Sequence, residues 1–390
     1  MSNLSFYQKP GDRYGFYQIG SINTYSRYQL IDIHHRLPQS WKWIYNDDFF
    51  GLFDWSKEPK KTLEQLYRER AAQLRQDNDY LILFYSGGYD SSNMLHAFLD
   101  NNIHFDELCV FYSRYDRISS QHNELSNFTW QKIKYLTDLY PWIKVRRVDY
   151  ADYFLKWDTL VKDAGYSSNL MDAFGISLPI NPLINDLMFK FIDDYQALLK
   201  KGKKVSWVWG VDKPCLRYLD NKWIFNFLDH MIQWNISPMR QTLDDGTIGN
   251  IEFFYWSPEA ECANIIIKQC HLLKKQYDAQ AQLDFSKIPG AKKFKDNFGY
   301  EIDKMNENFV KTIYPRDFKF KEKFFTLKNT HLRGDRDNWF FESNHDKAKL
   351  HFDLFNSLKS KTYDHYKSWY KDKNSIDSGF IGAISRDYLI

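Results

Sequence analysis

The stretch from Tyr80 to Asn93 constrains the fold of this chain more than any other part of the sequence. It begins with a short apolar and aromatic run, Tyr80 to Tyr85, which is typical of a buried parallel strand. Ser86-Gly87-Gly88 then turns the chain, and a helical pattern opens at Ser91–Ser92. One face of this predicted helix carries Met94, Leu95, Phe98 and Leu99. In the order strand, glycine loop, helix, backbone N–H groups and the positive end of the helix dipole converge on one point.

An anion such as a phosphate is the expected ligand of this loop. Gly87 and Gly88 allow a ligand to approach the backbone closely. Hydroxyl donors are added by Ser86, Ser91 and Ser92. Asp90 would repel a bare phosphate, so we expect its carboxylate to bind Mg²⁺ together with phosphate oxygens. The alternative is a serine-glycine turn without a ligand, and the complete seven-residue pattern favours the phosphate site.

The segment Ser86-Gly87-Gly88-Tyr89-Asp90-Ser91-Ser92 resembles the SGGxDSS loop of the PP-loop ATP pyrophosphatases, a superfamily that includes asparagine synthetase. The Walker pattern GxxxxGK[ST] is absent from the sequence. The resemblance implies an α/β fold of the PP-loop (HUP) type, the cofactors ATP and Mg²⁺, and release of AMP and pyrophosphate. The nucleotide-binding residues it implies are Ser86, Gly87, Gly88, Tyr89, Asp90, Ser91, Ser92, Tyr112, Ser113 and Gly210.

A second segment with candidate chemistry, Gly210-Val211-Asp212-Lys213, follows the apolar run Val205 to Trp209. It loosely resembles the glycine and acid loop that faces pyrophosphate in asparagine-synthetase-like enzymes, although their SGEGxDE form is absent. In that interpretation Asp212 shares Mg²⁺ with Asp90, and Lys213 neutralises the β- and γ-phosphates. Asp90, Asp212 and Lys213 are therefore the catalytic candidates, and Asp90 and Asp212 the metal ligands. The alternative is a solvated turn that holds an ion pair.

The alternation of predicted elements determines the expected fold class. Buried strands are predicted at 80–85, 108–112, 143–148 and 205–209, and helices at 60–76, 91–99, 124–139 and 185–200. Such alternation predicts a doubly wound, mainly parallel sheet with a nucleotide at the carboxyl ends of its strands. Further predictions are a hairpin within 14–33, a strand at 252–256, a helix from Ser257 to Lys275 and a helix at 363–370.

Three regions are predicted along the chain. Residues 1–59 form an N-terminal aromatic cap, residues 60–275 the pyrophosphatase domain, and residues 276–390 a lysine- and aromatic-rich extension. Nothing before residue 60 resembles a glutaminase, because position 2 is serine and no cysteine precedes Cys109. The extension looks tied to the body at its apolar end, Ser378 to Ser385.

Composition adds limits on compartment and partners. The chain has 390 residues, 43% of them hydrophobic, and a net charge of +3. The net charge by itself therefore does not indicate a nucleic-acid partner. No apolar run approaches the roughly 20 residues of a membrane helix, and we expect no membrane partner. The four cysteines are Cys109, Cys215, Cys262 and Cys270. Their wide spacing matches neither a zinc-binding CxxC motif nor a disulfide framework. A reducing cytoplasm is the expected location.

The leading functional prediction is an AMP-forming ligase that adenylates a carboxylate or amide oxygen of a small molecule for attack by ammonia or an amine. One alternative is modification of a base in tRNA or DNA, by thiolation or deazaguanine-type chemistry. The residues suited to nucleic acid are Lys292, Lys293, Lys295, Lys319, Lys321, Lys323, Phe324 and Trp339. The missing cysteine clusters and the acids among these lysines favour the small-molecule ligase. Another alternative is a non-catalytic nucleotide-binding protein, which Asp90 argues against. The sequence indicates neither the acceptor nor the oligomeric state.

Overall fold

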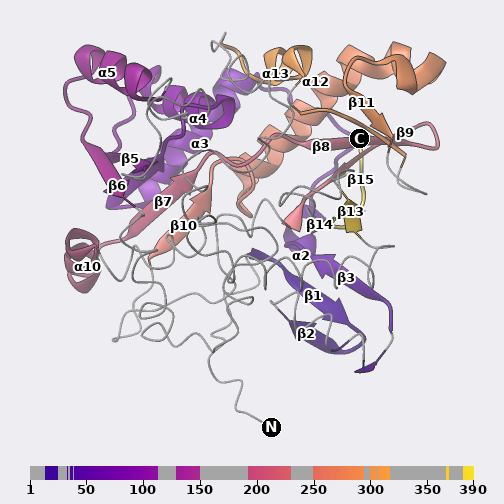
Figure 1. The fold of residues 1–390 in the computed structure, drawn as a ribbon, viewed down its shortest axis with the longest axis horizontal. Coiled ribbons are helices and arrows are strands. Elements are labelled where there is room, and N and C mark those ends of the chain that lie inside the picture. The colour runs from indigo at the N-terminus through magenta and orange to yellow at the C-terminus, as the bar shows by residue number, and fades with distance from the viewer. Residues whose placement is uncertain are drawn as a thin grey trace, which may run out of the picture.

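A five-stranded parallel sheet lies at the left of the described structure in Figure 1. The computed structural model describes residues 14–24, 33, 36–37, 39–112, 129–149, 192–229, 249–293, 299–304, 306–316, 366–368 and 381–390. The strands of the sheet, in spatial order, are β10 (Asn250–Phe253), β7 (Val205–Trp209), β4 (Tyr80–Phe84), β5 (Glu107–Tyr112) and β6 (Val145–Asp149). The order reverses at β4, because β5 and β6 lie to one side of it and β7 and β10 to the other.

Helices flank this sheet on two sides. In Figure 1, α3 (Leu63–Asp77), α4 (Tyr89–Leu99) and α5 (Trp130–Leu139) lie on one side of the sheet, and α10 (Asp193–Lys200) lies on the other. A capping box starts α3, since the Thr62 hydroxyl accepts the Gln65 N–H while the Gln65 side chain accepts the Thr62 N–H. The predicted α/β class with a parallel sheet between helices is therefore confirmed.

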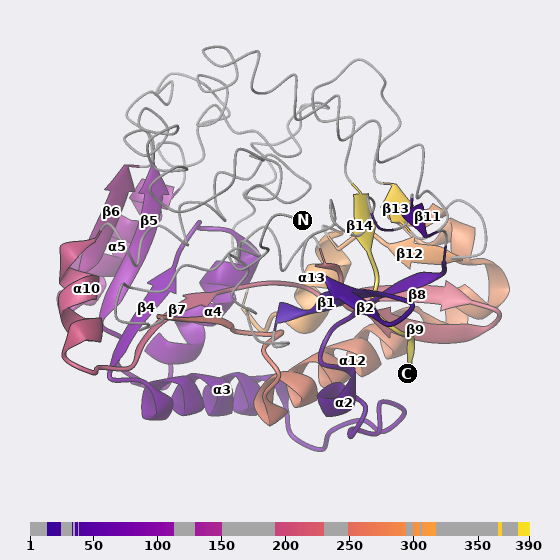
Figure 2. The same ribbon diagram turned by 90° about the horizontal axis from the view of Figure 1, so that it is seen from below.

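A second sheet is antiparallel and lies beside the long helix α12 (Ala260–Asp284), as Figure 2 shows. Its strands are β11 (Ala291–Lys293), β12 (Tyr300–Ile302), β8 (Cys215–Leu219), β9 (Lys222–Asn226) and β15 (Tyr388–Leu389). The 3₁₀ turn η3 (Phe285–Lys287) follows α12, and α13 (Glu307–Ile313) follows β12. Helix α12 crosses residue 275, the predicted end of the pyrophosphatase domain. Strands from both sides of that boundary share this sheet.

The N-terminal aromatic residues contact both sheets. They include the hairpin β1 (Phe16–Ile19) and β2 (Ile22–Thr24), strand β3 (Trp41–Ile44) and the short helix α2 (Asp47–Phe50). Trp55 stacks on Phe225 of β9 with ring centroids 5.1 Å apart. The Tyr14 hydroxyl donates to the carbonyl of Ile251 on β10 at 3.0 Å. These contacts join the second sheet and the edge strand of the parallel sheet to one aromatic core.

The start of α12 differs from the prediction. Strand β10 ends at Phe253 rather than at Trp256, and α12 begins at Ala260 and runs to Asp284. Ser257, predicted as the N-cap, donates its hydroxyl to Glu252 at 2.6 Å and accepts the Phe253 N–H at 2.9 Å. Its hydroxyl thus closes the turn after β10, and Glu259 becomes the N-cap.

Two further predicted helices differ in extent or kind. Helix α10 begins at Asp193, because Ile192 has extended backbone angles, while residues 185–191 lie outside the described part of the chain. Within 363–370 the described residues form strand β13 (Tyr366–Ser368) instead of a helix. It pairs with β14 (Ile381–Ala383), so strand pairing outweighs local helical spacing. Of the segment Ser378–Ser385, predicted to be tied to the body, the described part contacts it, because Ile384 bridges Leu228 and the Ser385 N–H donates to the Phe227 carbonyl at 3.0 Å.

Candidate functional site

The loop between β4 and α4 lies where the order of the parallel sheet reverses. Strand β4 ends at Phe84, and α4 begins at Tyr89, two residues earlier than predicted. Gly87 has a φ of +76°, a conformation that side chains disfavour. Gly88 is the N-cap, so the helix start presents backbone N–H groups rather than a capping side chain. This backbone suits an anion, which the helix dipole would also attract.

The three serines of the loop have different surroundings. Ser86 is exposed, and its hydroxyl accepts the Gly88 N–H at 3.3 Å. Ser91 is buried, and its hydroxyl accepts the Ser86 N–H at 3.3 Å and donates to the Gly88 carbonyl at 3.2 Å. Ser92 is also buried, and its hydroxyl accepts from the Lys132 ammonium group at 3.1 Å. Ser86 is therefore the loop serine that faces solvent, while Ser91 and Ser92 maintain the shape of the loop.

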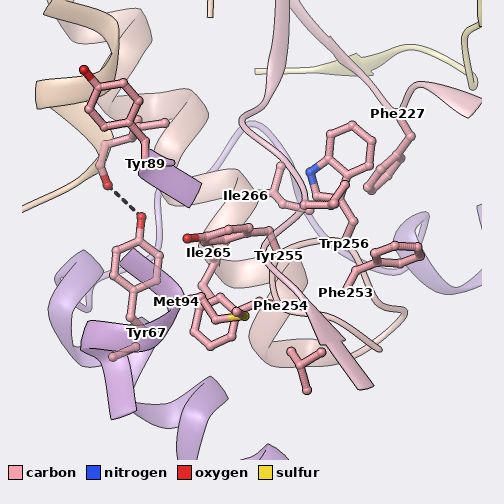
Figure 3. Packing of buried hydrophobic residues seen from close by; sticks show 14 of the residues in the cluster. Tyr67, Tyr89, Met94, Phe227, Phe253, Phe254, Tyr255, Trp256, Ile265 and Ile266 are labelled. Atoms are coloured by element: carbon pink, nitrogen blue, oxygen red, sulfur yellow. Dashed lines mark hydrogen bonds between the residues drawn. The ribbon is translucent and has the colours of Figure 1, made fainter. Parts of the chain in front are cut away.

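The aromatic residues predicted to bind nucleotide lie at or near the same edge of the sheet. The Tyr89 side chain is buried in the core, so its contribution to a ligand would come from its backbone (Figure 3). Tyr112 ends β5, and its ring lies 4.9 Å from the guanidinium carbon of Arg147. Ser113 lies outside the described residues.

Gly210 brings the end of β7 against the start of α4. A Cβ atom at this position would lie 2.9 Å from the carbonyl carbon and oxygen of Asp90 and from the backbone nitrogen of Ser91. Those are backbone atoms of a helix and cannot move aside as a flexible side chain could. Glycine is therefore required by this close approach, which places the segment after β7 directly beside the first turn of α4.

Alternating positive and negative side chains form a network at this contact. The Lys213 ammonium nitrogen lies 2.6 Å from Asp90 Oδ2 and 3.9 Å from Asp212 Oδ1. The other oxygen of Asp212 pairs with the ammonium group of Lys304. The other oxygen of Asp90 accepts a hydrogen bond from the Tyr314 hydroxyl. The structure thus brings together the three predicted catalytic residues and adds two from beyond residue 300.

Burial and neighbouring charges act in opposite directions on the pKa values of Asp212 and Lys304 in this network. Burial opposes ionisation of the Asp212 carboxyl, but the ammonium groups of Lys304 and Lys213 outweigh it and lower its pKa. Burial likewise opposes the charged form of Lys304, and the Asp212 carboxylate raises its pKa in return. Each member of the Asp212–Lys304 pair is thereby kept charged inside the protein.

The arrangement of Asp90 and Asp212 can be tested against the requirements of Mg²⁺. Both carboxylates approach one cation, the Lys213 ammonium group. Among the described residues no cluster of three or more His, Cys, Asp or Glu side chains could hold a metal. Mg²⁺ commonly binds one or two carboxylates and completes its shell with phosphate and water oxygens. Asp90 and Asp212 therefore fit Mg²⁺ that arrives with a polyphosphate.

Sequence reasoning missed Lys304 and Tyr314. Lys304 follows the short strand β12, and Tyr314 ends α13, both within the region predicted as an extension. Their local sequence carries no motif, and nothing in its spacing points to residues 90 or 212. Only the packing of α13 against α12 and the pairing of β12 with β8 bring them to the acids.

The lysine-rich segments proposed for nucleic acid are largely beyond what the structure describes. Lys292 and Lys293 form part of β11, and only their backbone is described. The other candidates, Lys295, Lys319, Lys321, Lys323, Phe324 and Trp339, lie outside the described residues.

Comparison with protein-family models and with curated proteins found no match for this chain. In the described part of the chain, no helix combines the length and the apolar character needed to cross a membrane.

Proposed function

We propose that this chain is an AMP-forming ligase of the PP-loop ATP pyrophosphatase type. It would adenylate a carboxylate or amide oxygen of a small molecule, for attack by ammonia or an amine. The observation that carries the proposal is the meeting of Asp90, Asp212 and Lys213 beside the Ser86–Ser92 loop. This meeting occurs where the strand order reverses, which is the usual ligand position in a wound parallel sheet.

The chemistry follows from the types of residue that meet there. A substrate oxygen attacks the α-phosphorus of ATP, the bond from that phosphorus to the bridging oxygen breaks, and pyrophosphate leaves with the electron pair. The amine then attacks the acyl carbon, a proton is lost from nitrogen, and AMP departs. Bound Mg²⁺ would neutralise charge on the pyrophosphate. N–H groups around Gly87 and Gly88 would hold phosphate oxygens, and Lys213 would stabilise the leaving group.

The four cysteines fit a reducing compartment, where we place the enzyme. Cys109, Cys215, Cys262 and Cys270 are all buried, and none of them is in a disulfide. Burial raises the pKa of the Cys109 thiol and of the Cys270 thiol, so neither is a reactive thiolate at neutral pH. The proposed reaction accordingly uses no cysteine nucleophile.

The proposal is tested by the fate of ATP labelled on its α-phosphate, incubated with Mg²⁺, the full chain and pools of carboxylates with ammonia. We expect labelled AMP and no labelled ADP, together with acceptor-dependent exchange of pyrophosphate into ATP. The matched control is Gly88→Val. Gly88 has an extended backbone that valine also adopts, so the variant should fold while its branched side chain obstructs the anion site.

Other outcomes would contradict the proposal in different ways. Formation of ADP would indicate transfer of the γ-phosphate and exclude the AMP-forming class. AMP formed only when tRNA or DNA is added would favour base modification. Tight ATP binding without product from any pool would favour a non-catalytic nucleotide-binding protein. Nucleotide binding by folded Gly88→Val equal to that of the wild type would refute the phosphate loop itself.

A further inference from the structure

Three buried tyrosines converge on Asp90 and on the segment that contacts it. The Tyr255 hydroxyl donates to the backbone carbonyl of Asp90 at 3.0 Å. The Tyr314 hydroxyl donates to the side-chain oxygen Oδ1 of the same residue. The Tyr67 hydroxyl donates to the Ile313 carbonyl at 2.6 Å, and this bond is the dashed line at Tyr67 in Figure 3. Tyr67 and Tyr255 come from α3 and from the turn after β10, and their rings point toward one region.

Tyr314 is held rigidly before any ligand arrives. It follows the last residue of α13, and its N–H donates to the Val310 carbonyl at 2.9 Å. Its ring lies 6.1 Å from that of Tyr255, and the residue is 2% exposed. The Tyr314 hydroxyl, which donates to Asp90, is thus a buried donor positioned by the end of α13 and by the Tyr255 ring.

This fixed donor makes the two oxygens of Asp90 unequal. Oδ1 accepts from a buried hydroxyl, whereas Oδ2 faces the Lys213 ammonium group at 2.6 Å. The Asp90 side chain is 22% exposed, whereas Tyr314 is 2% exposed. The hydrogen bond from Tyr314 fixes the plane of the carboxylate, as hydrogen bonds to metal-ligating carboxylates do.

We propose that Tyr314 is a positioning residue, which holds Oδ1 of Asp90 and so reserves Oδ2 for a divalent cation. This inference rests on the proposed function, since it takes Asp90 as a ligand of the metal that accompanies the nucleotide. It assigns to residues 300–316 a part in the ATP site beyond packing. Lys213 pairs with Oδ2 in this structure, and a divalent cation held there would free the ammonium group for the polyphosphate.

The test compares Tyr314→Phe with the wild type in binding of Mn²⁺ together with a non-hydrolysable ATP analogue, followed by the electron paramagnetic resonance of Mn²⁺. Loss of a hydrogen bond that orients a metal ligand weakens metal binding by about 10–100-fold, which is the loss expected here. Metal-free binding of pyrophosphate should be unchanged. Turnover should recover toward the wild-type kcat at saturating Mg²⁺, because the ligand itself remains.

Tyr255→Phe is the matched control, because it removes a similar buried hydroxyl that contacts the backbone of Asp90 and not its carboxylate. It should reduce stability and leave the affinity for Mn²⁺ within about twofold of wild type, because the carboxylate keeps its orientation. Equal Mn²⁺ affinity in Tyr314→Phe and wild type would overturn the inference alone. So would a Tyr314→Phe chain that fails to fold when Tyr255→Phe folds, since the hydroxyl would then be a structural element. A wild type that binds no metal-nucleotide complex would overturn the proposed function, and this inference with it.

Discussion

The parallel sheet has one acid at the amino ends of its strands and one at the carboxyl ends, and the two acids differ in what surrounds them. Glu107 opens β5 at the amino edge, and its side chain is 0% exposed. Its carboxylate accepts from Arg146, Lys144, Tyr80 and Tyr195, at distances of 2.5 to 2.8 Å. Asp90, at the carboxyl edge, also pairs with a lysine and a tyrosine, yet it borders the glycine loop and remains 22% exposed.

The comparison teaches that a buried ion pair is not in itself evidence for a site. Around Glu107 two cations and two phenols satisfy both carboxylate oxygens and close them off from solvent. Burial opposes ionisation of this carboxyl, but Arg146 and the other donors lower its pKa to about 2. Around Asp90 one cation lies between two acids, beside the glycine loop. We therefore assign a structural role to Glu107 and propose a chemical role for Asp90.

The sharpest contrast is expected from Asp90→Ala. Removing this carboxylate should lower turnover by about 10³-fold, because metal-assisted stabilisation of transition-state charge amounts to several kcal/mol. Affinity for ATP should change far less, since the loop backbone is intact. Steady-state kinetics and equilibrium binding measure the two effects. Asp212→Ala should resemble it, and normal turnover by Asp212→Ala beside a dead Asp90→Ala would refute the shared metal.

Glu107→Ala should act on stability instead. It leaves the Arg146 guanidinium, which is 18% exposed, without its main partner, and breaking such a buried pair costs about 3 kcal/mol. Nucleotide binding by the folded fraction should be unchanged, because Glu107 lies at the opposite edge of the sheet. Urea denaturation and nucleotide titration test this separation. An ATP affinity that falls with unchanged stability would reverse the two assigned roles.

Gly210→Ala should combine a moderate effect on stability with one on the site. Its Cβ would contact the backbone of Asp90 and Ser91 at 2.9 Å, and such overpacking typically costs about 1–3 kcal/mol. The displaced first turn of α4 should also weaken nucleotide binding. Gly202→Ala is the control, because Gly202 has a φ of +72° but a Cβ atom added there would meet no other atom within 4 Å. The control should lose stability by strain alone and bind nucleotide normally.

The last expected effect appears only at acid pH, in the pH dependence of stability. The Glu107 pKa is about 2 in the folded chain against an ordinary 4.5, so the unfolded chain takes up the proton first as the pH falls. The contribution of Glu107 is fully present above 4.5 and is lost between 4.5 and about 2. Glu107→Gln removes the titrating group and should flatten the decline over this interval. Equal slopes for both proteins in chemical denaturation would show that Glu107 does not govern it.

Local sequence was sufficient to predict the elements that have a clear apolar pattern or a turn with a glycine. The strands at 80–85 and 205–209 and the hairpin near Gly20 appear close to their predicted bounds as β4, β7 and the β1–β2 pair. Errors arose where a tertiary contact outweighed local preference, as at Ser257 and in β13. Strands β8 and β9 were not predicted, because their aromatic residues pack in a core formed by distant parts of the chain.

For the candidate site, the sequence by itself identified the loop Ser86–Ser92 and the Gly210–Lys213 segment, because their chemistry depends on residue types at short spacing. Only the tertiary structure placed Lys213 between Asp90 and Asp212 and brought Lys304 and Tyr314 to these acids. Tyr314 is 224 residues from Asp90 along the chain. No local pattern encodes such a separation, because it follows from how α13, α3 and α12 bury their apolar faces together. The sequence determined the parts that we propose bind an anion, and long-range packing decided which groups lie against the acids.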